Sequence, residues 1–587
     1  MCGILGTNKD GQIVDDPKVV CALTHRGPDS TQSYSDGEMG FRISRLAIVN
    51  SEFDDQPSFG CSDRYVSVMN GEIYNYKSLA LELEKLGHQF PEEFSDAAIL
   101  PHMLEEYGYD FAKKLDGMFA IAIWDHKLKE MMIYRDAIGI KPIYYQISGK
   151  QLLFASEISP IIKMTDKSYD VDYEMIENFA KHNLISAPHT IFRDIYCLIP
   201  GTYLKLGPNQ INLVRWHNFN PNRNKDSRSM EQSINTLEEL LINSISDQLG
   251  HGISGALLLS GGLDSSLIAS IIKTRLNARV ETYHLSYEND IETKQIETKI
   301  AREVANNLGF PLHELQLTSK DYFQYLDEAL NTFSQPFGGV TSTFFISKYI
   351  SERHKVCLTG DGADELFGSY RNIQQAARVY YGQEELSTPK SSKSELNFMK
   401  FLNIRNTQVN KQGNPNHFYP LLKELNEFSK TTNVFNYSLT ESQLRLLPDQ
   451  VLLFSDHLGM AHGLEIRPPF LSKAIVEFSR QLPLEFLIDD RGTTKLILKE
   501  LCLRYFDQNF VSRKKEGFML PLIQWMKKEE AREWTESKLV RYEESKNKAL
   551  KIKEIQRLFD DYHNGKNNEF FKVYRLAVLM HYLANHE

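Results

Sequence analysis

The stretch GALLLSGGLDSSLIASIIKTRL, residues 255–276, determines the fold expected for most of the chain. Its short apolar run, Gly255–Leu259, is typical of a buried strand, and Ser265–Leu276 is typical of an amphipathic helix. The glycine-rich loop SGGLDSS (Ser260–Ser266) joins them. Such a loop can curl its backbone around an anion, because the following helix N-terminus supplies free N–H groups and a positive dipole. The segment therefore predicts a phosphate site between a strand and a helix.

The same alternation continues on both sides of this unit. A helix is expected over Ile234–Gln248, then the strand Arg279–Tyr287, the helix Lys294–Leu308 and the strand Lys355–Gly360. Strands that alternate with helices predict an α/β domain with a doubly wound parallel sheet, whose ligands bind at the carboxyl ends of the strands. From Gln375 onward the chain is expected to be mostly helical.

The first 205 residues have a different pattern. Short apolar and β-branched runs, such as Tyr65–Tyr76 and Gly117–Asp125, follow one another and are interrupted by two helical stretches. This pattern predicts an α+β arrangement in which sheets pack against helices. A polar, turn-rich segment follows. We therefore expect an N-terminal domain over residues 1–205, a linker over 206–232 and a second domain over 233–587.

Composition excludes several classes of partner. The 587 residues carry a net charge of −10, which provides no basic surface for nucleic acid. The longest apolar runs, such as Met118–Trp124, are far shorter than the ~18 residues of a membrane span. The start, MCGILGTNKD, lacks the basic and apolar regions of a signal peptide. Six scattered cysteines without a CxxC pair argue against a disulfide framework or a zinc knuckle, so a cytoplasmic location is expected.

Cys2 is the first candidate catalytic residue. Removal of the initiator methionine would leave a thiol (pKa ~8.5) and a free α-amine (pKa ~7.7–8.0) on one residue, which supplies a nucleophile and its general base. A cysteine at this position is by itself most often incidental. Five segments accompany it in order, however: HRGPDS (His25–Ser30), SRLAIV (Ser44–Val49), MNGEIYNY (Met69–Tyr76), FSDAAIL (Phe94–Leu100) and RDAIGIKPIYY (Arg135–Tyr145).

Together these segments resemble the glutaminase domain of class II glutamine amidotransferases, an N-terminal-nucleophile fold built as an αββα sandwich. The resemblance implies that Cys2 attacks the side-chain amide of glutamine, giving a thioester and ammonia. It assigns the oxyanion to the Asn70 side chain and the Gly71 N–H, a common arrangement for stabilising developing negative charge. The other glutamine-binding residues that it implies are Arg45 for the α-carboxylate, Asp96 for the α-ammonium, and Ile48, Val49 and Glu72 around them.

The glycine-rich loop is the second candidate site. It lacks the lysine of a Walker A loop, and Asp264 suits phosphate only if Mg²⁺ lies between them. The loop resembles the PP-loop of ATP pyrophosphatases, which cleave ATP between the α and β phosphates. A second strand end carries LTGDGADELFGSY (Leu358–Tyr370). Its three clustered carboxylates are costly unless they are solvated or paired with a metal.

With two further segments, Asp456–Leu471 and Ser512–Trp525, the region from about 230 to 530 resembles the asparagine synthetase domain. The resemblance implies that Asp264 and Asp364 hold Mg²⁺ and pyrophosphate, and that Asp361 serves acyl-adenylate formation. Lys515 matches a lysine that neutralises charge as ammonia attacks and AMP leaves. The ATP-binding residues implied are Leu259, Ser260, Gly261, Gly262, Asp264, Ser265, Ser266, Leu285, Thr359 and Gly360.

The two halves together predict a glutamine-dependent, ATP-consuming amide ligase of the glutamine-hydrolysing asparagine synthetase family, with ATP and Mg²⁺ as cofactors. L-aspartate is the favoured acceptor, and the family resemblance suggests a homodimer. Ammonia in water would be protonated and lose its nucleophilicity, so we expect it to pass internally between the sites. A phosphosugar amidotransferase would share only the Cys2 half. A non-catalytic relative would be expected to lose Cys2, Asp264 or Lys515, and all three are present.

Several segments depart from the common family pattern. GHGISGALLLSGG precedes and includes the loop, ETYHLSYEN forms the next strand, and Gln335 and Ser472 stand where acids are common. All are expected on or near the acceptor side, so they bear on which carboxylate is amidated. The alternative is therefore the same chemistry on another carboxylate, such as a uronic acid in surface-polysaccharide biosynthesis.

Overall fold

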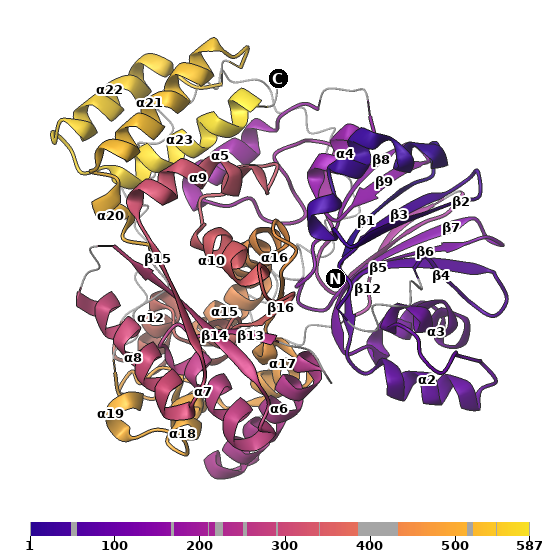
Figure 1. The fold of residues 1–587 in the computed structure, drawn as a ribbon, viewed down its shortest axis with the longest axis horizontal. Helices are drawn as coiled ribbons and strands as arrows, with labels where there is room; N and C mark the ends of the chain where they lie inside the picture. The colour runs from indigo at the N-terminus through magenta and orange to yellow at the C-terminus, as the bar shows by residue number, and fades with distance from the viewer. Residues whose placement is uncertain are drawn as a thin grey trace.

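The computed structural model describes residues 2–48, 56–165, 169–208, 210–217, 227–250, 255–288, 292–339, 341–384, 432–513, 520–547 and 549–585. The N-terminal strands form one lobe, and a parallel sheet with its surrounding helices forms the other (Figure 1). Across these ranges, none of the helices combines the length and the apolar character that a bilayer crossing requires.

The N-terminal lobe contains two six-stranded antiparallel sheets, ordered β10-β8-β9-β1-β3-β2 and β12-β11-β7-β6-β5-β4. Their strands are β1 (Cys2–Thr7), β2 (Ser30–Ser35), β3 (Gly40–Arg45), β4 (Ser58–Phe59), β5 (Tyr65–Ile73), β6 (Gly117–Asp125), β7 (Glu130–Arg135), β8 (Tyr144–Ser148), β9 (Gln151–Ala155), β10 (Tyr196–Cys197), β11 (Thr202–Leu206) and β12 (Ile211–Arg215).

The two sheets pack face to face, with residues such as Ile4, Val68 and Ala120 forming the core between them. Two helices, α2 (Tyr76–Lys85) and α3 (Ile99–Tyr107), cover the outer face of the second sheet through a separate apolar cluster. The helices α1 and α4 cover the first sheet. This layering confirms the expected αββα sandwich. The last strand, β12, lies beyond residue 205, where the linker was expected to begin, and the proposed domain division stays a prediction.

The second lobe is built on a five-stranded sheet in the order β15-β14-β13-β16-β17, and every neighbouring pair is parallel. This is the doubly wound order expected from the alternating sequence pattern. One strand lies in the part predicted to be mostly helical, since β17 falls within the segment Asp456–Leu471. The strands are β13 (Gly255–Leu258), β14 (Val280–Tyr287), β15 (Leu312–Leu317), β16 (Val356–Leu358) and β17 (Glu465–Arg467).

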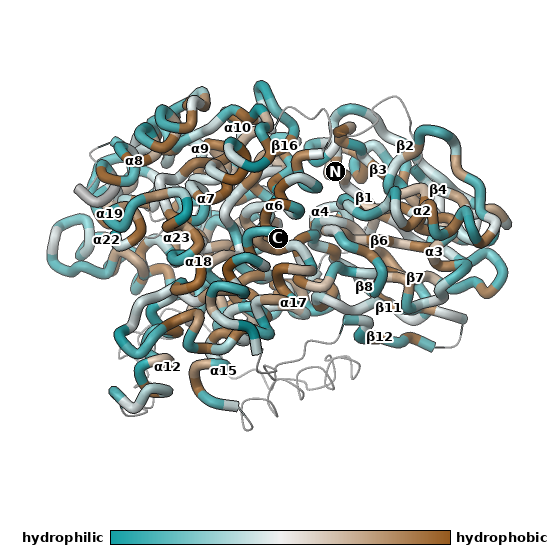
Figure 2. Tube along the Cα trace, turned by 90° about the horizontal axis from the view of Figure 1, so that it is seen from below, coloured by the Kyte–Doolittle hydropathy of each residue, from teal (hydrophilic) through white to brown (hydrophobic). Residues whose placement is uncertain are grey.

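Helices surround this sheet and form the C-terminal end of the chain, and Figure 2 shows hydrophobic residues along inner elements and hydrophilic residues in outer loops. Helix α6 begins at a capping box formed by Ser229 and Gln232. The helices are α1 (Pro17–Cys21), α2 (Tyr76–Lys85), α3 (Ile99–Tyr107), α4 (Ile158–Lys163), α5 (Tyr173–His182), α6 (Met230–Leu249), α7 (Leu263–Ile271), α8 (Glu292–Leu308), α9 (Ser319–Asn331), α10 (Ser342–Ser351), α11 (Ala363–Phe367), α12 (Arg371–Tyr380), α15 (Val434–Glu441), α16 (Leu452–Met460), α17 (Lys473–Gln481), α18 (Leu496–Cys502), α19 (Gln508–Val511), α20 (Leu522–Trp525), α21 (Glu529–Glu544), α22 (Ile552–His563) and α23 (Phe570–Asn585).

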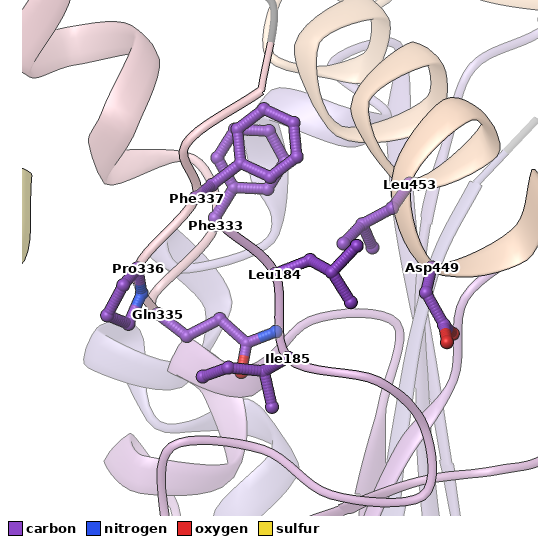
Figure 3. A pocket seen from close by; sticks show the side chains of 8 residues that line it. All are labelled: Leu184, Ile185, Phe333, Gln335, Pro336, Phe337, Asp449 and Leu453. Carbon is purple, nitrogen blue, oxygen red and sulfur yellow. The ribbon is translucent and has the colours of Figure 1, made fainter. Parts of the chain in front are cut away.

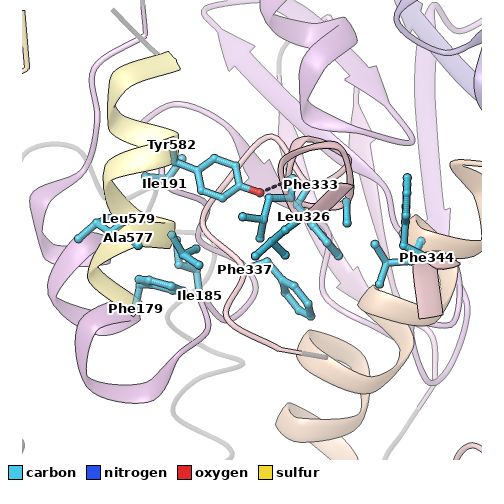
Figure 4. Packing of buried hydrophobic residues seen from close by; sticks show 14 of the residues in the cluster. Phe179, Ile185, Ile191, Leu326, Phe333, Phe337, Phe344, Ala577, Leu579 and Tyr582 are labelled. Carbon is cyan, nitrogen blue, oxygen red and sulfur yellow. Dashed lines mark hydrogen bonds between the residues drawn. The ribbon is translucent and has the colours of Figure 1, made fainter. Parts of the chain in front are cut away.

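The two lobes share apolar cores. Helix α5, from the N-terminal part of the sequence, packs against the C-terminal helix α23, where Phe179 and Ile185 lie beside Leu579 (Figure 4). The hydroxyl of Tyr582 on α23 donates a hydrogen bond to the Leu330 carbonyl at the end of α9. The chain therefore buries its first and last thirds against each other.

Candidate functional site

Cys2 is the first residue of β1, which lies in the interior of its sheet. The antiparallel register pairs it with Arg45 at the end of β3, so the local sheet geometry alone brings the predicted carboxylate-binding cation beside the thiol. The Cys2 backbone N–H donates a hydrogen bond to Oδ1 of Asn70, 3.3 Å away, near the end of β5. Three residues predicted from separate motifs therefore meet at one place.

Asn70 is fully buried, and its Nδ2 group has no hydrogen-bond partner among the described residues. A buried unpaired amide donor costs roughly 1–3 kcal/mol, so such groups are rare without a function. The bond from Cys2 to Oδ1 fixes the amide and leaves its donor side available next to the thiol. An oriented, unpaired donor is what a developing oxyanion requires.

Gly71 follows with φ +150°, and a Cβ there would lie 2.0 Å from the Met118 carbonyl oxygen of β6. In the structure the crowding comes from the neighbouring strand, so the pairing of β5 with β6 already requires glycine.

Burial raises the pKa of the Cys2 thiol, while a hydrogen bond from the Leu46 backbone and the charge of Arg45 lower it. Asp96, in the short helix η3 (Asp96–Ala98), accepts a 2.7 Å hydrogen bond from the Ile73 N–H. Burial, together with the charge of Glu72, raises the Asp96 pKa to about 8. The pocket therefore combines a buried thiol with a carboxyl whose ionised form needs a cationic partner.

Two of the predicted glutamine-binding residues lie against the second lobe or the apolar core that it shares with the first. Ile48 is partly buried and packs against the core that continues into the second lobe. Glu72 lies 3.3 Å from the Arg467 guanidinium of β17, so it contacts the second lobe directly. Val49 lies outside the described residues.

The HRGPDS motif lies at the boundary of the lobes. Arg26 is fully buried and donates to Glu157 of its own lobe (3.0 Å) and to Asp456 of α16 (2.7 Å). Lys141 from the RDAIGIKP segment also reaches Asp456, at 3.2 Å. Asp29 pairs with Lys355, just before β16, at 2.7 Å. Two of the N-terminal motifs, HRGPDS and RDAIGIKPIYY, therefore contact the second lobe.

The second site forms where β13 and β16, which are parallel neighbours, end side by side. In the loop after β13 the Ser265 hydroxyl accepts a 3.2 Å hydrogen bond from the Ser260 N–H. Gly261 has φ +79°, and a Cβ there would lie 2.2 Å from the Glu297 carbonyl of α8. The buried Ser266 hydroxyl lacks a hydrogen-bond partner within the part of the chain that the structure describes.

Asp264 and Asp364 come together at this edge through a third residue. The Lys495 ammonium lies 2.6 and 2.7 Å from the two Asp264 carboxylate oxygens and 2.5 Å from Asp364. The attraction of both aspartates outweighs burial and raises the Lys495 pKa. The two acids predicted to hold a metal therefore already share one cation.

Sequence reasoning missed Lys495. It immediately precedes α18, where a cation is disfavoured by the helix dipole, and it has the left-handed φ of +54°. A lysine just before a helix is a weak signal in the sequence, and the left-handed φ is seen only in the structure. Nothing in the sequence relates it to Asp264, 231 residues away.

The other predicted residues follow the same edge. Asp361 accepts hydrogen bonds from the Thr359 hydroxyl (3.0 Å) and the Ser455 hydroxyl of α16 (2.8 Å), and burial raises its pKa. Gly360 packs against Asp264, because a Cβ there would lie 3.1 Å from the Cβ of that residue. These contacts hold the loop after β16 against the first turn of α7.

Some of the residues expected to bind ATP already have backbone hydrogen bonds or are buried within the sheet. The Leu259 N–H donates to the Tyr283 carbonyl at 2.8 Å, and the Leu259 carbonyl bonds the His284 ring. Leu285 is buried within β14. Gly262 caps the start of α7. Lys515 lies outside the described residues.

Gln335, one of the departures from the family pattern, is buried where the lobes meet, and its Oε1 accepts the Ile191 N–H at 3.2 Å. In Figure 3 its amide lies beside Ile185. It lines a small, partly open pocket together with Leu184, Ile185, Phe333, Pro336, Phe337, Asp449 and Leu453.

Two family models match different parts of the chain. The family model described as "Asparagine synthase" matches residues 236–584, and that described as "Glutamine amidotransferase domain" matches residues 1–217. The chain is 26% identical to "Asparagine synthetase [glutamine-hydrolyzing] 1" of Bacillus subtilis (strain 168), over 99% of this chain and 96% of that protein.

Two further relatives show the same likeness. The chain is 27% identical to asparagine synthetase [glutamine-hydrolyzing] 3 of the same bacterium, over 85% of this chain and 84% of the relative. It is 31% identical to asparagine synthetase [glutamine-hydrolyzing] 2 of Oryza sativa subsp. japonica, over 66% of this chain and 62% of the relative. The chain therefore belongs to the asparagine synthase family and carries a glutamine amidotransferase domain in its N-terminal part.

Proposed function

We propose that this enzyme is a glutamine-dependent carbon–nitrogen ligase that uses ATP to convert L-aspartate to L-asparagine, with AMP, pyrophosphate and glutamate as the other products. The observation that carries the proposal is the buried Asn70 Nδ2 group beside Cys2, which has no hydrogen-bond partner among the described residues, in a chain that also brings Asp264 and Asp364 together at a PP-loop.

In the first step the Cys2 sulfur attacks the glutamine side-chain amide. Asn70 Nδ2 and the Gly71 N–H stabilise the oxyanion, and collapse of the tetrahedral adduct releases ammonia. Arg45 binds the substrate carboxylate through its planar guanidinium. Asp96 pairs with the α-ammonium, and the family resemblance also assigns Ile48, Val49 and Glu72 to glutamine binding. Water then hydrolyses the thioester to glutamate.

At the second site the loop residues bind ATP, and the acceptor carboxylate attacks the α-phosphorus, releasing pyrophosphate. The Ser266 hydroxyl and the N–H groups of Gly261 and Gly262 would donate to phosphate oxygens, since a helix N-terminus favours anions. Ser260, Ser265, Leu259, Leu285, Thr359 and Gly360 complete the proposed ATP site. Asp361 orients the reacting carboxylate, and Lys515 neutralises charge as ammonia displaces AMP.

The acidic pair fits a magnesium ion. Asp264 and Asp364 share the Lys495 ammonium, so a positive charge between them is already accommodated, and carboxylate oxygens are the ligands that Mg²⁺ prefers. When bound, Mg²⁺ would neutralise phosphate charge. Lys495 lies close enough to both acids to interact with the pyrophosphate group as well.

An internal route for ammonia is supported by the packing between the sites. One apolar cluster contains Leu46 and Met118, which contact the Cys2 pocket, and also Leu257, Leu358 and Met460 around the parallel sheet. Ammonia that passes among apolar groups stays unprotonated.

We further propose a homodimer, on the family resemblance, and a cytoplasmic location, which the six free cysteines support.

A second acceptor is favoured by one observation. An α-amino acid acceptor needs a carboxylate to pair with its ammonium, and Ser472 stands where the family pattern has an acid. The preceding residue, Leu471, packs against Gly362 beside Asp361, so position 472 is near the second site. A uronic acid carries no ammonium and would not need that acid.

The test is pyrophosphate release with ATP, Mg²⁺ and glutamine, screened first with L-aspartate and then with free and nucleotide-linked uronic acids. Release that depends on aspartate, with asparagine formed, supports the main proposal. Release with a uronic acid only would move the enzyme to the second acceptor. An enzyme that makes glutamate but releases no pyrophosphate with any of these acceptors would contradict both.

A further inference from the structure

A cluster of metal-ligand side chains lies in the N-terminal lobe, outside all the residues assigned to either reaction. Cys61 follows β4, His88 follows α2, and His102 is on α3. The Cys61 sulfur is 3.7 Å from Nδ1 of His88 and 3.5 Å from Nδ1 of His102, and the two Nδ1 atoms are 3.0 Å apart. All three ligand atoms lie within 4.8 Å of one another.

These separations match the edges of a tetrahedral zinc site. With Zn–S near 2.3 Å and Zn–N near 2.0–2.1 Å, a tetrahedron has S···N edges of about 3.6 Å and an N···N edge of about 3.3 Å. The observed S···N distances straddle the first value, and the N···N distance is slightly below the second. Separate hydrogen bonds could account for each of these contacts, whereas a single bound ion would account for all three distances together.

The outer atoms of the cluster are arranged as a metal site requires. Nε2 of His88 lies 2.9 Å from Glu106, and ligating histidines usually donate their second N–H to a carboxylate in this way. Glu105 has one carboxylate oxygen 3.9 Å from Nδ1 of His88, while its other oxygen accepts from the Ser62 hydroxyl. Glu105 can therefore move into the fourth position, or a water can occupy it.

Burial also fits this assignment. His88 and His102 are 9% and 6% exposed, and the Phe90 ring packs at 4.8 Å on that of His102. The Cys61 residue is exposed, which leaves an entry path for an ion. The cluster thus has an apolar wall on one side and an accessible thiol on the other.

We propose that Cys61, His88 and His102 form a structural site for Zn²⁺, completed by Glu105 or water. Such an ion would tie the β4–β5 connection to the ends of α2 and α3. Helix α3 continues directly from η3, which carries Asp96, so the ion would also hold that helix in place. The binding site itself does not depend on the proposed reaction, because none of its ligands takes part in it.

The test measures bound metal on the full-length protein. Zinc content is determined after purification and after titration of the metal-free protein with Zn²⁺ against a chromophoric chelator. We expect about one equivalent per chain in the wild type, loss of that equivalent in Cys61→Ser and in His102→Gln, and affinity reduced by about 10–100-fold in Glu106→Gln. Co²⁺ loading should give a sulfur-to-metal charge-transfer band that Cys61→Ser abolishes.

Two controls separate this site from other thiols. Cys21→Ser removes another exposed cysteine, and Cys2→Ala removes the buried thiol of the glutaminase pocket; both should keep the zinc. The melting temperature of the wild type should rise with Zn²⁺, and that of a folded Cys61→Ser variant should not. Failure of the wild type to take up stoichiometric zinc, or equal uptake by Cys61→Ser, would overturn the proposal.

Discussion

The oxygen and the nitrogen of the Asn70 side-chain amide have different hydrogen-bonding surroundings. Its oxygen accepts from the Cys2 backbone, and its nitrogen is buried without a partner among the described residues. A buried donor without a partner is costly, and under the proposed mechanism an oxyanion would accept from that nitrogen. The hydrogen bond at the oxygen therefore orients the nitrogen that the proposal assigns to the oxyanion.

Replacing Asn70 with alanine should reduce kcat for glutamine hydrolysis by about 10²–10³-fold, the usual effect of losing one oxyanion donor. Glutamate release measures this activity. Synthesis with ammonia instead of glutamine should continue at the wild-type rate, because that reaction bypasses the pocket. Cys2→Ala serves as the reference, with glutamine-dependent turnover abolished and ammonia-dependent turnover kept. Equal loss of both activities in Asn70→Ala would contradict the assignment.

The Asp96 pKa of about 8, raised by burial and by the charge of Glu72, predicts pH-dependent binding of glutamine. Below pH 8 the free carboxyl is mainly protonated and cannot pair with the α-ammonium until it loses its proton. Affinity should therefore rise by up to about tenfold per pH unit between pH 6 and 8, and then level off. Calorimetric titration of Cys2→Ala with glutamine would measure binding without turnover.

The control for this prediction is Asp96→Asn in the same Cys2→Ala background. The amide cannot ionise, so binding should be weak at every pH and nearly independent of it. A pH dependence that persists unchanged in the asparagine variant would assign the titration to another group.

At the scale of elements, the second site depends on how closely strand ends and helix starts approach one another. The loop after β13 passes so near α8 that Gly261 has no room for a side chain, and the loop after β16 approaches α7 less closely at Gly360, where an added Cβ would lie 3.1 Å from the Cβ of Asp264. The Lys495 ammonium is brought in by α18, whose Leu498 shares a core with Leu267 of α7. Asp264 on α7 and Asp364 on α11 therefore meet at Lys495, which immediately precedes α18.

Gly261→Ala should abolish pyrophosphate release with either nitrogen source. The added Cβ would lie 2.2 Å from the Glu297 carbonyl, so the loop or α8 must shift and misplace the phosphate-binding groups. Gly37→Ala provides the matched control, since its φ of +87° is similar but no atom lies within 4 Å of the added carbon. That variant carries only the backbone strain of about 1–2 kcal/mol and should keep its activity. Activity retained in Gly261→Ala would contradict the proposed role of this loop.

At the scale of the whole molecule, the two sites are joined by a buried layer of ion pairs. Arg26 and Lys141 from one lobe meet Asp456 from the other, and Glu72 meets Arg467 close by. Buried charges of this kind add little net stability, but removing one partner leaves the others unpaired. The layer therefore specifies how the lobes fit together more than how tightly they bind.

Arg26→Met should lower the melting temperature, consistent with the loss of about 3–5 kcal/mol expected when a buried ion pair is broken. It should also raise the ratio of glutamate formed to pyrophosphate released, because ammonia escapes where the lobes separate. Arg42→Met is the matched control, since its pair with the half-exposed Asp15 lies at the surface. A variant that is destabilised while its product ratio stays unchanged would show that the interface does not confine ammonia.

The sequence by itself determined both layer architectures. Alternating strands and helices after residue 255 predicted the parallel sheet, and the apolar runs before residue 205 predicted sheets packed against helices, because periodicity and turn residues are local properties. The αββα order of those layers was implied by the family resemblance. The sequence also placed Cys2, Asn70 and Asp264 in motifs whose spacing follows from the strand and loop that carry them. Those inferences needed no knowledge of distant contacts.

Only the tertiary structure decided which distant residues meet. Lys495 between the two aspartates, Gln335 against the Ile191 N–H, and the cluster of Cys61 with two histidines all join segments separated by long stretches of chain. No periodicity relates such residues, since their approach results from helix packing and from burial of a core shared by the lobes. The local sequence pattern specifies the helices and strands, and burial of a common apolar core determines which of them pack together.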